Sequence, residues 1–206
     1  METKAKELIT QDIIDSALSY DEFVQLADEL FEQGITTDGV TTDSMLDYTK
    51  ISVQRLKRIK KSGKLFPEFE EDIRNNKRSM VWLVLNEGWC GDGSQILPFM
   101  FKMGELAGNI DVKVILREKH PEIMDAHLTN GKRTIPKLIA LDADTLEEIG
   151  GWGSRPKVAE ELFEELKADE SLTGKERQAK LHMWYTKNKG YEIQKELVEL
   201  LRSVNA

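Results

Sequence analysis

The spacing of apolar residues predicts helices in the first part of the chain. Over residues 19–34 they recur every three or four positions, as on one helix face, and Gly34 can end the helix. A second helix is predicted over 44–64, and its last turns are strongly basic. We expect this basic end to be a solvated helix face, with a docking patch for an acidic partner as the alternative. The acidic segment 67–76 could neutralise it.

The middle of the chain alternates strands with helices. Residues 80–86 form a continuous apolar run, which is typical of a central strand buried on both faces. The other elements predicted here are strands over 110–118, 137–141 and 146–149, and helices over 91–107, 121–131 and 154–169. The order β-α-β-α-β-β-α predicts a small α/β sandwich in which parallel strands come first and an antiparallel hairpin closes the sheet.

The last part of the chain is predicted to be a helical hairpin with a turn near 188–190. The pattern therefore divides the chain into three parts. These are an N-terminal helical extension over 1–75, an α/β core over 76–168, and a C-terminal helical hairpin packed on the core over 169–206.

The composition narrows the class of protein. Of the 206 residues, 40% are hydrophobic and 32% are charged, which suits a globular chain with a buried core. The formal net charge of −8 argues against nucleic acid as a general partner. No apolar run approaches the roughly 20 residues that cross a bilayer, and the N-terminus lacks the apolar segment of a signal peptide. No membrane partner is therefore expected, and the cytoplasm is the expected location.

The cysteine and histidine content limits the chemistry. A single cysteine excludes an internal disulfide, and with only three histidines the chain offers no clustered metal site. His120 is expected at a helix start, and His127 and His182 on helix surfaces or in packing positions. No metal and no cofactor are expected.

The one cysteine, Cys90, lies where a predicted strand gives way to a predicted helix. The unpaired N–H groups and the dipole of a helix N-terminus favour an anion there, and the thiolate is the reactive form of cysteine. Trp89 and Gly91 flank Cys90, and the Gly-Asp-Gly run leaves the helix start open to a ligand. A functional thiol of lowered pKa is predicted, with a buried inert cysteine as the alternative. The negative charge of Asp92 would oppose that lowering, although Asp also suits a first helical turn.

The stretch VWLVLNEGWCGDGSQILPFM resembles the active-site strand and helix of the thioredoxin family, whose motif is W-C-G-P-C. Trp89, Cys90 and Gly91 match the motif, and Pro98 lies where the family's helix is kinked. Further along, RTIPKLIAL resembles the loop in which the family places a cis-proline, here Pro136. The W-C-G-D-G variant and the helical ends look like a bacterial branch of this family. The resemblance implies a thioredoxin-like three-layer fold with additional N- and C-terminal helices.

The resemblance also implies a site. Cys90 would be the catalytic residue, and in the family the residue before the cis-proline offers its backbone to an extended substrate. Ile135 would have that role here. The substrate groove would be formed by Trp89, Gly91, Asp92, Thr134, Ile135 and Pro136.

Two departures from the family pattern change the expected chemistry. Gly93 stands where the family has its second cysteine, and Val84 stands where it has a buried carboxylate. The dithiol route is therefore closed, and a monothiol route remains, in which Cys90 attacks a disulfide or mixed disulfide and an external thiol resolves the adduct. The expected partner is a protein or small-molecule thiol or disulfide, and the activity would be that of a monothiol disulfide oxidoreductase.

The alternative is a redox-inactive thioredoxin-fold protein that serves as a binding or adaptor module, since a fold does not fix a function. The sequence leaves the oligomeric state open, although Cys90 could link two chains under oxidation.

Overall fold

A four-stranded sheet lies at the centre of the computed structural model, which describes residues 8–205. The strand order is β2-β1-β3-β4. The central strand β1 (Met80–Asn86) runs parallel to β2 (Ile110–Leu116) and antiparallel to β3 (Lys137–Asp142). The hairpin of β3 and β4 (Glu148–Gly153) completes the sheet. The predicted order of strands is therefore confirmed.

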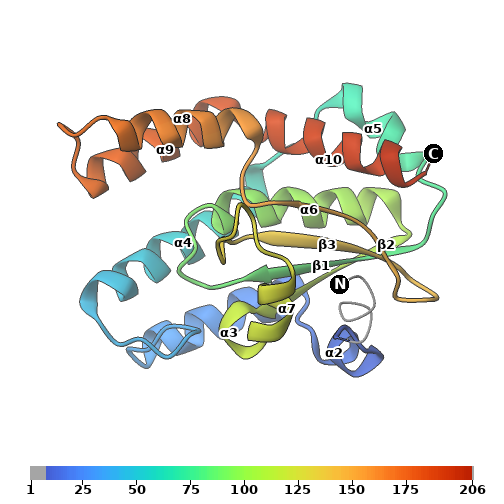
Figure 1. The fold of residues 1–206 in the computed structure, drawn as a ribbon, viewed down its shortest axis with the longest axis horizontal. Coiled ribbons are helices and arrows are strands. Elements are labelled where there is room, and N and C mark those ends of the chain that lie inside the picture. Colours follow the sequence, from blue (N-terminus) through green and yellow to red (C-terminus); the bar gives the residue numbers. More distant parts are fainter. Residues whose placement is uncertain (1–7, 206) are drawn as a thin grey trace.

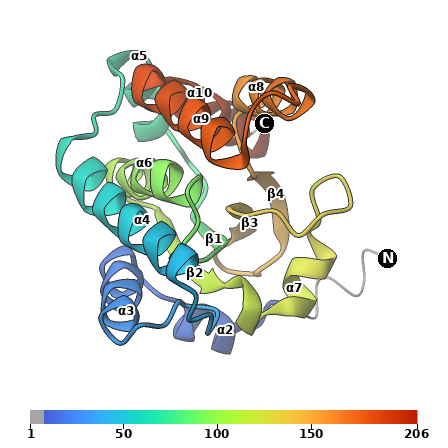
Figure 2. The same cartoon turned by 90° about the vertical axis from the view of Figure 1, so that its left-hand side faces the viewer.

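Helices cover both faces of this sheet (Figures 1 and 2). They are α2 (Gln11–Ser16), α3 (Tyr20–Glu32), α4 (Asp43–Ser62), α5 (Pro67–Arg74), α6 (Gly93–Ala107), the short 3-10 turn η1 (Arg117–Lys119), α7 (Pro121–Ala126), α8 (Lys157–Ala168), α9 (Gly174–Asn188) and α10 (Tyr191–Val204). The mixed α/β class with extra helices is confirmed. The short helix α2 was not predicted. No helix within residues 8–205 is long and apolar enough to cross a membrane.

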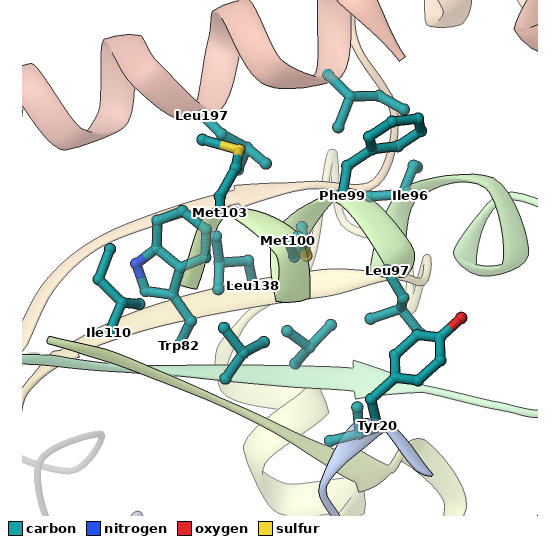
Figure 3. Close-up of a cluster of buried hydrophobic side chains, with 14 of the residues drawn as sticks. Tyr20, Trp82, Ile96, Leu97, Phe99, Met100, Met103, Ile110, Leu138 and Leu197 are labelled. Carbon is teal, nitrogen blue, oxygen red and sulfur yellow. The ribbon is translucent and has the colours of Figure 1, made fainter. Parts of the chain in front are cut away.

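The alternation of side chains along β1 separates two apolar cores. Successive side chains of a strand point to opposite faces, so a strand that is apolar throughout needs cover on both. Figure 3 shows Trp82 on the face covered by α6. Met80, Trp82 and Val84 pack with α6 and the helices around it, whereas Val81, Leu83 and Leu85 pack with α2 and α7.

Local signals fix the ends of the predicted N-terminal helices. Ser19 and Glu22 form a capping box at the start of α3, each accepting a hydrogen bond from the backbone N–H of the other. Helix α4 ends at Ser62, directly before Gly63. Both helices thus begin and end within about two residues of the positions that the sequence indicates.

Two lysines at the basic end of α4 pair with α3, and no residue of this end pairs with the acidic segment 67–76 in the described part of the chain. Lys57 lies 2.5 Å from Asp28, and Lys60 lies 2.7 Å from Asp21. The acidic segment forms α5, which packs against α10 instead. The expected neutralisation by 67–76 is wrong, because that segment is carried to the other side of α6. The exposed pairs fit a solvated helix face and contribute little stability each.

The helix that packs on β4 at the edge of the sheet is α10, whereas the helix predicted over 154–169 lies elsewhere. Helix α8 forms within that segment but packs chiefly on α9, whereas α10 contacts both β4 and α6. A Cβ at Gly150 of β4 would come within 2.8 Å of Leu200 and 3.2 Å of Val204. Periodicity marks α8 and α10 alike as amphipathic, and only α10 buries a full apolar face. The C-terminal part of the chain therefore completes the core.

Phe99 of α6 lies in tight contact with the turn before α10. Gly190 precedes α10 with φ 84°, and a Cβ there would overlap the Phe99 ring, with Cε1 only 2.8 Å away. Figure 3 shows Phe99 pointing from α6 away from the strands. Any side chain at position 190 must displace this ring or the turn.

We expect Gly190→Ala to lower the free energy of unfolding by about 2–4 kcal/mol, because it adds overpacking to a left-handed backbone. Gly39→Ala is the matched control, since Gly39 has φ 83° and nothing within 4 Å of an added Cβ. Gly39→Ala should lower the free energy of unfolding by only about 1 kcal/mol, which is the cost of placing alanine in a left-handed backbone conformation. Urea denaturation measures both, and equal losses would show that contact with Phe99 does not constrain the turn.

Candidate functional site

Cys90 lies in the short connection between β1 and α6. Its N–H donates to the carbonyl of Glu87 at 3.0 Å, and its carbonyl accepts from the N–H of Ser94 at 3.0 Å. The sulfur accepts from the N–H of Gly93 at 3.3 Å, and the thiol donates to the carbonyl of Ile135 at 3.5 Å. The fold thus places the thiol at the N-terminus of α6 and against the loop before β3.

The loop before β3 brings the other residues expected in the groove next to Cys90. Ile135 and Pro136 are buried, and the peptide bond between them is cis. The N–H of Thr134 donates to the carbonyl of Lys132 at 2.9 Å. The hydroxyl of Thr134 is buried and has no hydrogen-bond partner among the described residues.

Burial dominates the electrostatics of the thiol. Cys90 is only 5% exposed. The pKa of the thiol is raised to about 12, chiefly by burial and then by the neighbouring charge of Asp92, while the N–H groups of Gly93 and Asp92 and the charge of Arg155 partly oppose the rise. The expected lowering by the helix N-terminus is therefore wrong for this closed site. At neutral pH the thiol is protonated.

Asp92 is not an open groove residue but the centre of a buried ionic cluster. Its Oδ2 accepts from Arg155 Nε at 2.9 Å and Nη2 at 2.8 Å, and its Oδ1 accepts from the hydroxyl of Tyr185 at 2.8 Å. Arg155 also pairs with Glu160 at 2.6 Å. Burial, and then Asp92, hold the pKa of Tyr185 well above its usual value. The cluster ties the segments around α8 and α9 to the cysteine motif.

His182 of α9 covers Gly91. Its ring atom Cε1 lies 2.8 Å from the position that a Cβ at Gly91 would take, so only glycine fits there. Arg55 of α4 donates to His182 Nε2 at 3.0 Å. Burial, helped by Arg55 and Arg155, lowers the pKa of His182 to about 4, so the ring is neutral. Its Nδ1 is buried and finds no partner within residues 8–205.

Trp89 is held on the other side of Cys90 by the loop between α3 and α4. Its indole Nε1 donates to Asp38 at 2.8 Å, and the Arg117 guanidinium lies 5.2 Å from its ring centroid. Glu87 accepts from the hydroxyl of Thr37 and from the N–H of Glu118. Burial raises the pKa of Glu87. The N-terminal part of the chain is therefore built into the site.

Asn86 occupies the space that a second cysteine would need. A Cβ at Gly93 would lie 2.6 Å from Asn86 Nδ2 and 2.7 Å from its Cγ. Asn86 Nδ2 donates to the carbonyl of Glu87 at 3.1 Å, and its Oδ1 has no partner in the described part of the chain. Val84, where the family has a carboxylate, is fully buried in the apolar core. With Asn86 in this position, a resolving thiol does not fit at position 93.

The predicted site residues meet, but they do not form an open groove. Sequence reasoning missed the residues that cover them, which are Asp38, Arg55, Arg155, His182 and Tyr185. The sequence held a signal for only one of these residues. Asp92 is a charged residue inside a buried motif, so it needs a charged partner, which proves to be Arg155. No group of three or more His, Cys, Asp or Glu among residues 8–205 could hold a metal ion.

The thiol of Cys90 should ionise far above the ordinary value of about 8.5. Ultraviolet absorbance of the thiolate, taken as the difference between the native chain and Cys90→Ser, measures this midpoint. Because the native thiol keeps its proton where the unfolded one has lost it, Cys90 should destabilise the native protein relative to Cys90→Ser as pH rises from about 8.5 towards 12. A native midpoint at or below 8.5 would contradict the closed site.

Gly93→Ala should lower the free energy of unfolding by about 1–3 kcal/mol, because its methyl group overpacks against Asn86. Asn86→Ala removes that obstacle. In a double-mutant cycle the second change should recover at least about 1 kcal/mol of the loss. Strictly additive losses in urea denaturation would mean that Asn86 does not exclude a side chain at position 93.

Comparison with known proteins agrees with this geometry. A family model described as Thioredoxin matches residues 39–167. The match begins before α4, inside the part assigned from sequence to an N-terminal extension. No curated protein matches the chain.

Two solved structures share the fold. The crystal structure of a protein of unknown function from Pseudomonas aeruginosa is 19% identical, covers 92% of this chain and 99% of its own, and has a TM-score of 0.53. An HIV epitope scaffold is 20% identical, covers 86% of this chain and 96% of its own, and has a TM-score of 0.51. These likenesses support the thioredoxin-like fold with its extra helices. With the family model spanning more than half of its length, the chain belongs to the thioredoxin family.

Proposed function

We propose that this protein is a thiol-redox protein that works through Cys90 alone, with an external thiol that resolves the adduct. The observation that carries the proposal is the position of the sulfur. It lies at the start of α6, accepts a hydrogen bond from the Gly93 N–H, and faces the backbone carbonyl of Ile135. An extended substrate beside Ile135 would present its disulfide to this sulfur.

The reaction proceeds in two exchanges. The Cys90 thiolate attacks the glutathione sulfur of a protein–glutathione mixed disulfide, the substrate S–S bond breaks, and the departing substrate thiolate takes a proton from water. A second glutathione then loses its proton and attacks the glutathione sulfur of the new Cys90–glutathione disulfide, which releases the Cys90 thiolate. The substrate is reduced and the glutathione is oxidised to its disulfide. No second cysteine is needed, in keeping with Asn86 beside Gly93.

This chemistry requires an open form of the site. In the closed form the thiol is buried and protonated, and His182 lies over the adjacent Gly91. Displacing the start of the C-terminal hairpin would admit water and substrate and would remove the largest cause of the raised pKa. The Gly93 N–H and the helix dipole would then favour the thiolate.

A second function is supported by a specific observation. A thiol 5% exposed, with a pKa raised to about 12, is typical of an inert structural cysteine. On that basis the fold would serve as a redox-inactive binding or adaptor module.

Turnover of a peptide–glutathione mixed disulfide by the native chain and by Cys90→Ser separates the two functions. The monothiol function predicts a loss of at least about 100-fold in Cys90→Ser, since the nucleophile is removed. Equal rates would leave only the binding role.

Removing the His182 side chain, which lies over Gly91, should speed the same reaction. His182→Ala is expected to raise both the turnover and the alkylation rate of Cys90 by about tenfold, because it removes the group packed over Gly91. The control is Met183→Ala on the same helix, since Met183 is 57% exposed and should change neither rate. If His182→Ala is alkylated faster than the native chain but turns over the mixed disulfide no faster than Cys90→Ser, the result would favour the binding module.

A further inference from the structure

A cavity of about 600 Å³ lies behind the cysteine site, between the end of α4, helix α6 and the turn that joins α9 to α10. A larger hollow of about 1040 Å³ lies at the amino ends of β1 and β2, far from Cys90, and combines charges of both signs. The smaller cavity has the size range of small-molecule sites. Its lining combines apolar side chains with positively charged ones.

The floor of the cavity is apolar. It is formed by Phe99 of α6, Ile59 at the end of α4 and Ile193 of α10, with Leu65 and Phe66 from the loop between α4 and α5. These residues come from the N-terminal, central and C-terminal parts of the chain. The cavity therefore exists only in the assembled fold, and its floor suits an alkyl or aromatic group.

The rim of the cavity is positively charged. Arg58, Lys64 and Lys189 line it, and none of them forms an ion pair with another residue of the described chain. These three cations surround one opening, although the formal net charge of the chain is −8. Charge complementarity therefore points to an anionic head group at the rim.

A side-chain amide adds a hydrogen-bonding point in the wall of the cavity. Gln95 of α6 is only 5% exposed as a whole residue and lines the cavity. Its backbone N–H donates to the carbonyl of Asp92, and its side-chain amide has no hydrogen-bond partner within residues 8–205. The amide atoms are not among those that are cut off from solvent without a partner, so a ligand in the cavity could replace water as their partner.

We propose that this cavity binds a small organic anion with a carboxylate head, an apolar body and an amide or hydroxyl group beside the head. The carboxylate meets Arg58, Lys64 and Lys189, the body covers Phe99 and Ile193, and the polar group pairs with Gln95. This binding site is independent of the redox chemistry proposed for Cys90. Tyr185 forms part of the wall between the two, since it lines the cavity and donates to Asp92.

Calorimetry at low ionic strength with two matched probes tests this proposal on the full chain. Decanoate supplies the head and the body, and N-octanoylglycine adds an amide at nearly the same length. Both should bind with one-to-one stoichiometry, and N-octanoylglycine should bind at least about fivefold tighter because its amide pairs with Gln95. In Gln95→Leu that preference should disappear.

The charged rim is tested by a second pair of variants. Arg58→Ala/Lys64→Ala should weaken both probes about tenfold, since each exposed ionic contact is worth a factor of about two to five. The control is Lys61→Ala/Lys187→Ala, which removes the same charge from α4 and α9 outside the cavity and should change binding little. No saturable binding, equal affinity for decanol and decanoate, or an unchanged probe preference in Gln95→Leu would overturn the proposal.

Discussion

The buried carboxylate of Asp92 is the constraint on which the rest of the site depends. A charge placed next to a buried thiol must be paired, because leaving one partner of a buried pair alone costs about 3–5 kcal/mol. Arg155 and the hydroxyl of Tyr185 supply that pairing. Arg155 lies just before α8 and Tyr185 lies in α9, so satisfying Asp92 draws both segments over the cysteine motif and closes the site.

The closed site explains why the thiol departs from the behaviour that its position suggests. The start of α6 offers an N–H to the sulfur, which favours the thiolate, but burial and the charge of Asp92 act in the opposite direction and prevail. His182 is kept neutral by the same dry surroundings, so it adds no positive charge that would favour the thiolate. The reactivity of Cys90 is therefore governed by access rather than by the motif alone.

The extensions are structural parts of this thioredoxin-family fold and not additions beside it. Helix α10 covers β4, the loop between α3 and α4 holds Trp89, and Arg55 of α4 supports His182. The family match over residues 39–167 includes α4 but ends before α9 and α10. The same assembly creates the cavity around Gln95, because its walls come from all three parts of the chain.

The sequence by itself determined the strands, most helices, and the meeting of Cys90 with Ile135 and Pro136. The strands and helices follow from local periodicity and from capping residues, whereas the meeting of Cys90 with Ile135 and Pro136 was implied by the resemblance to the thioredoxin family. Only the tertiary structure decided which groups pair with Asp92, since Arg155 and Tyr185 lie 63 and 93 residues away. It also decided that α10 packs on β4 and that the thiol is buried. Such choices depend on which apolar faces and charges fit together in space, and no local pattern records that fit.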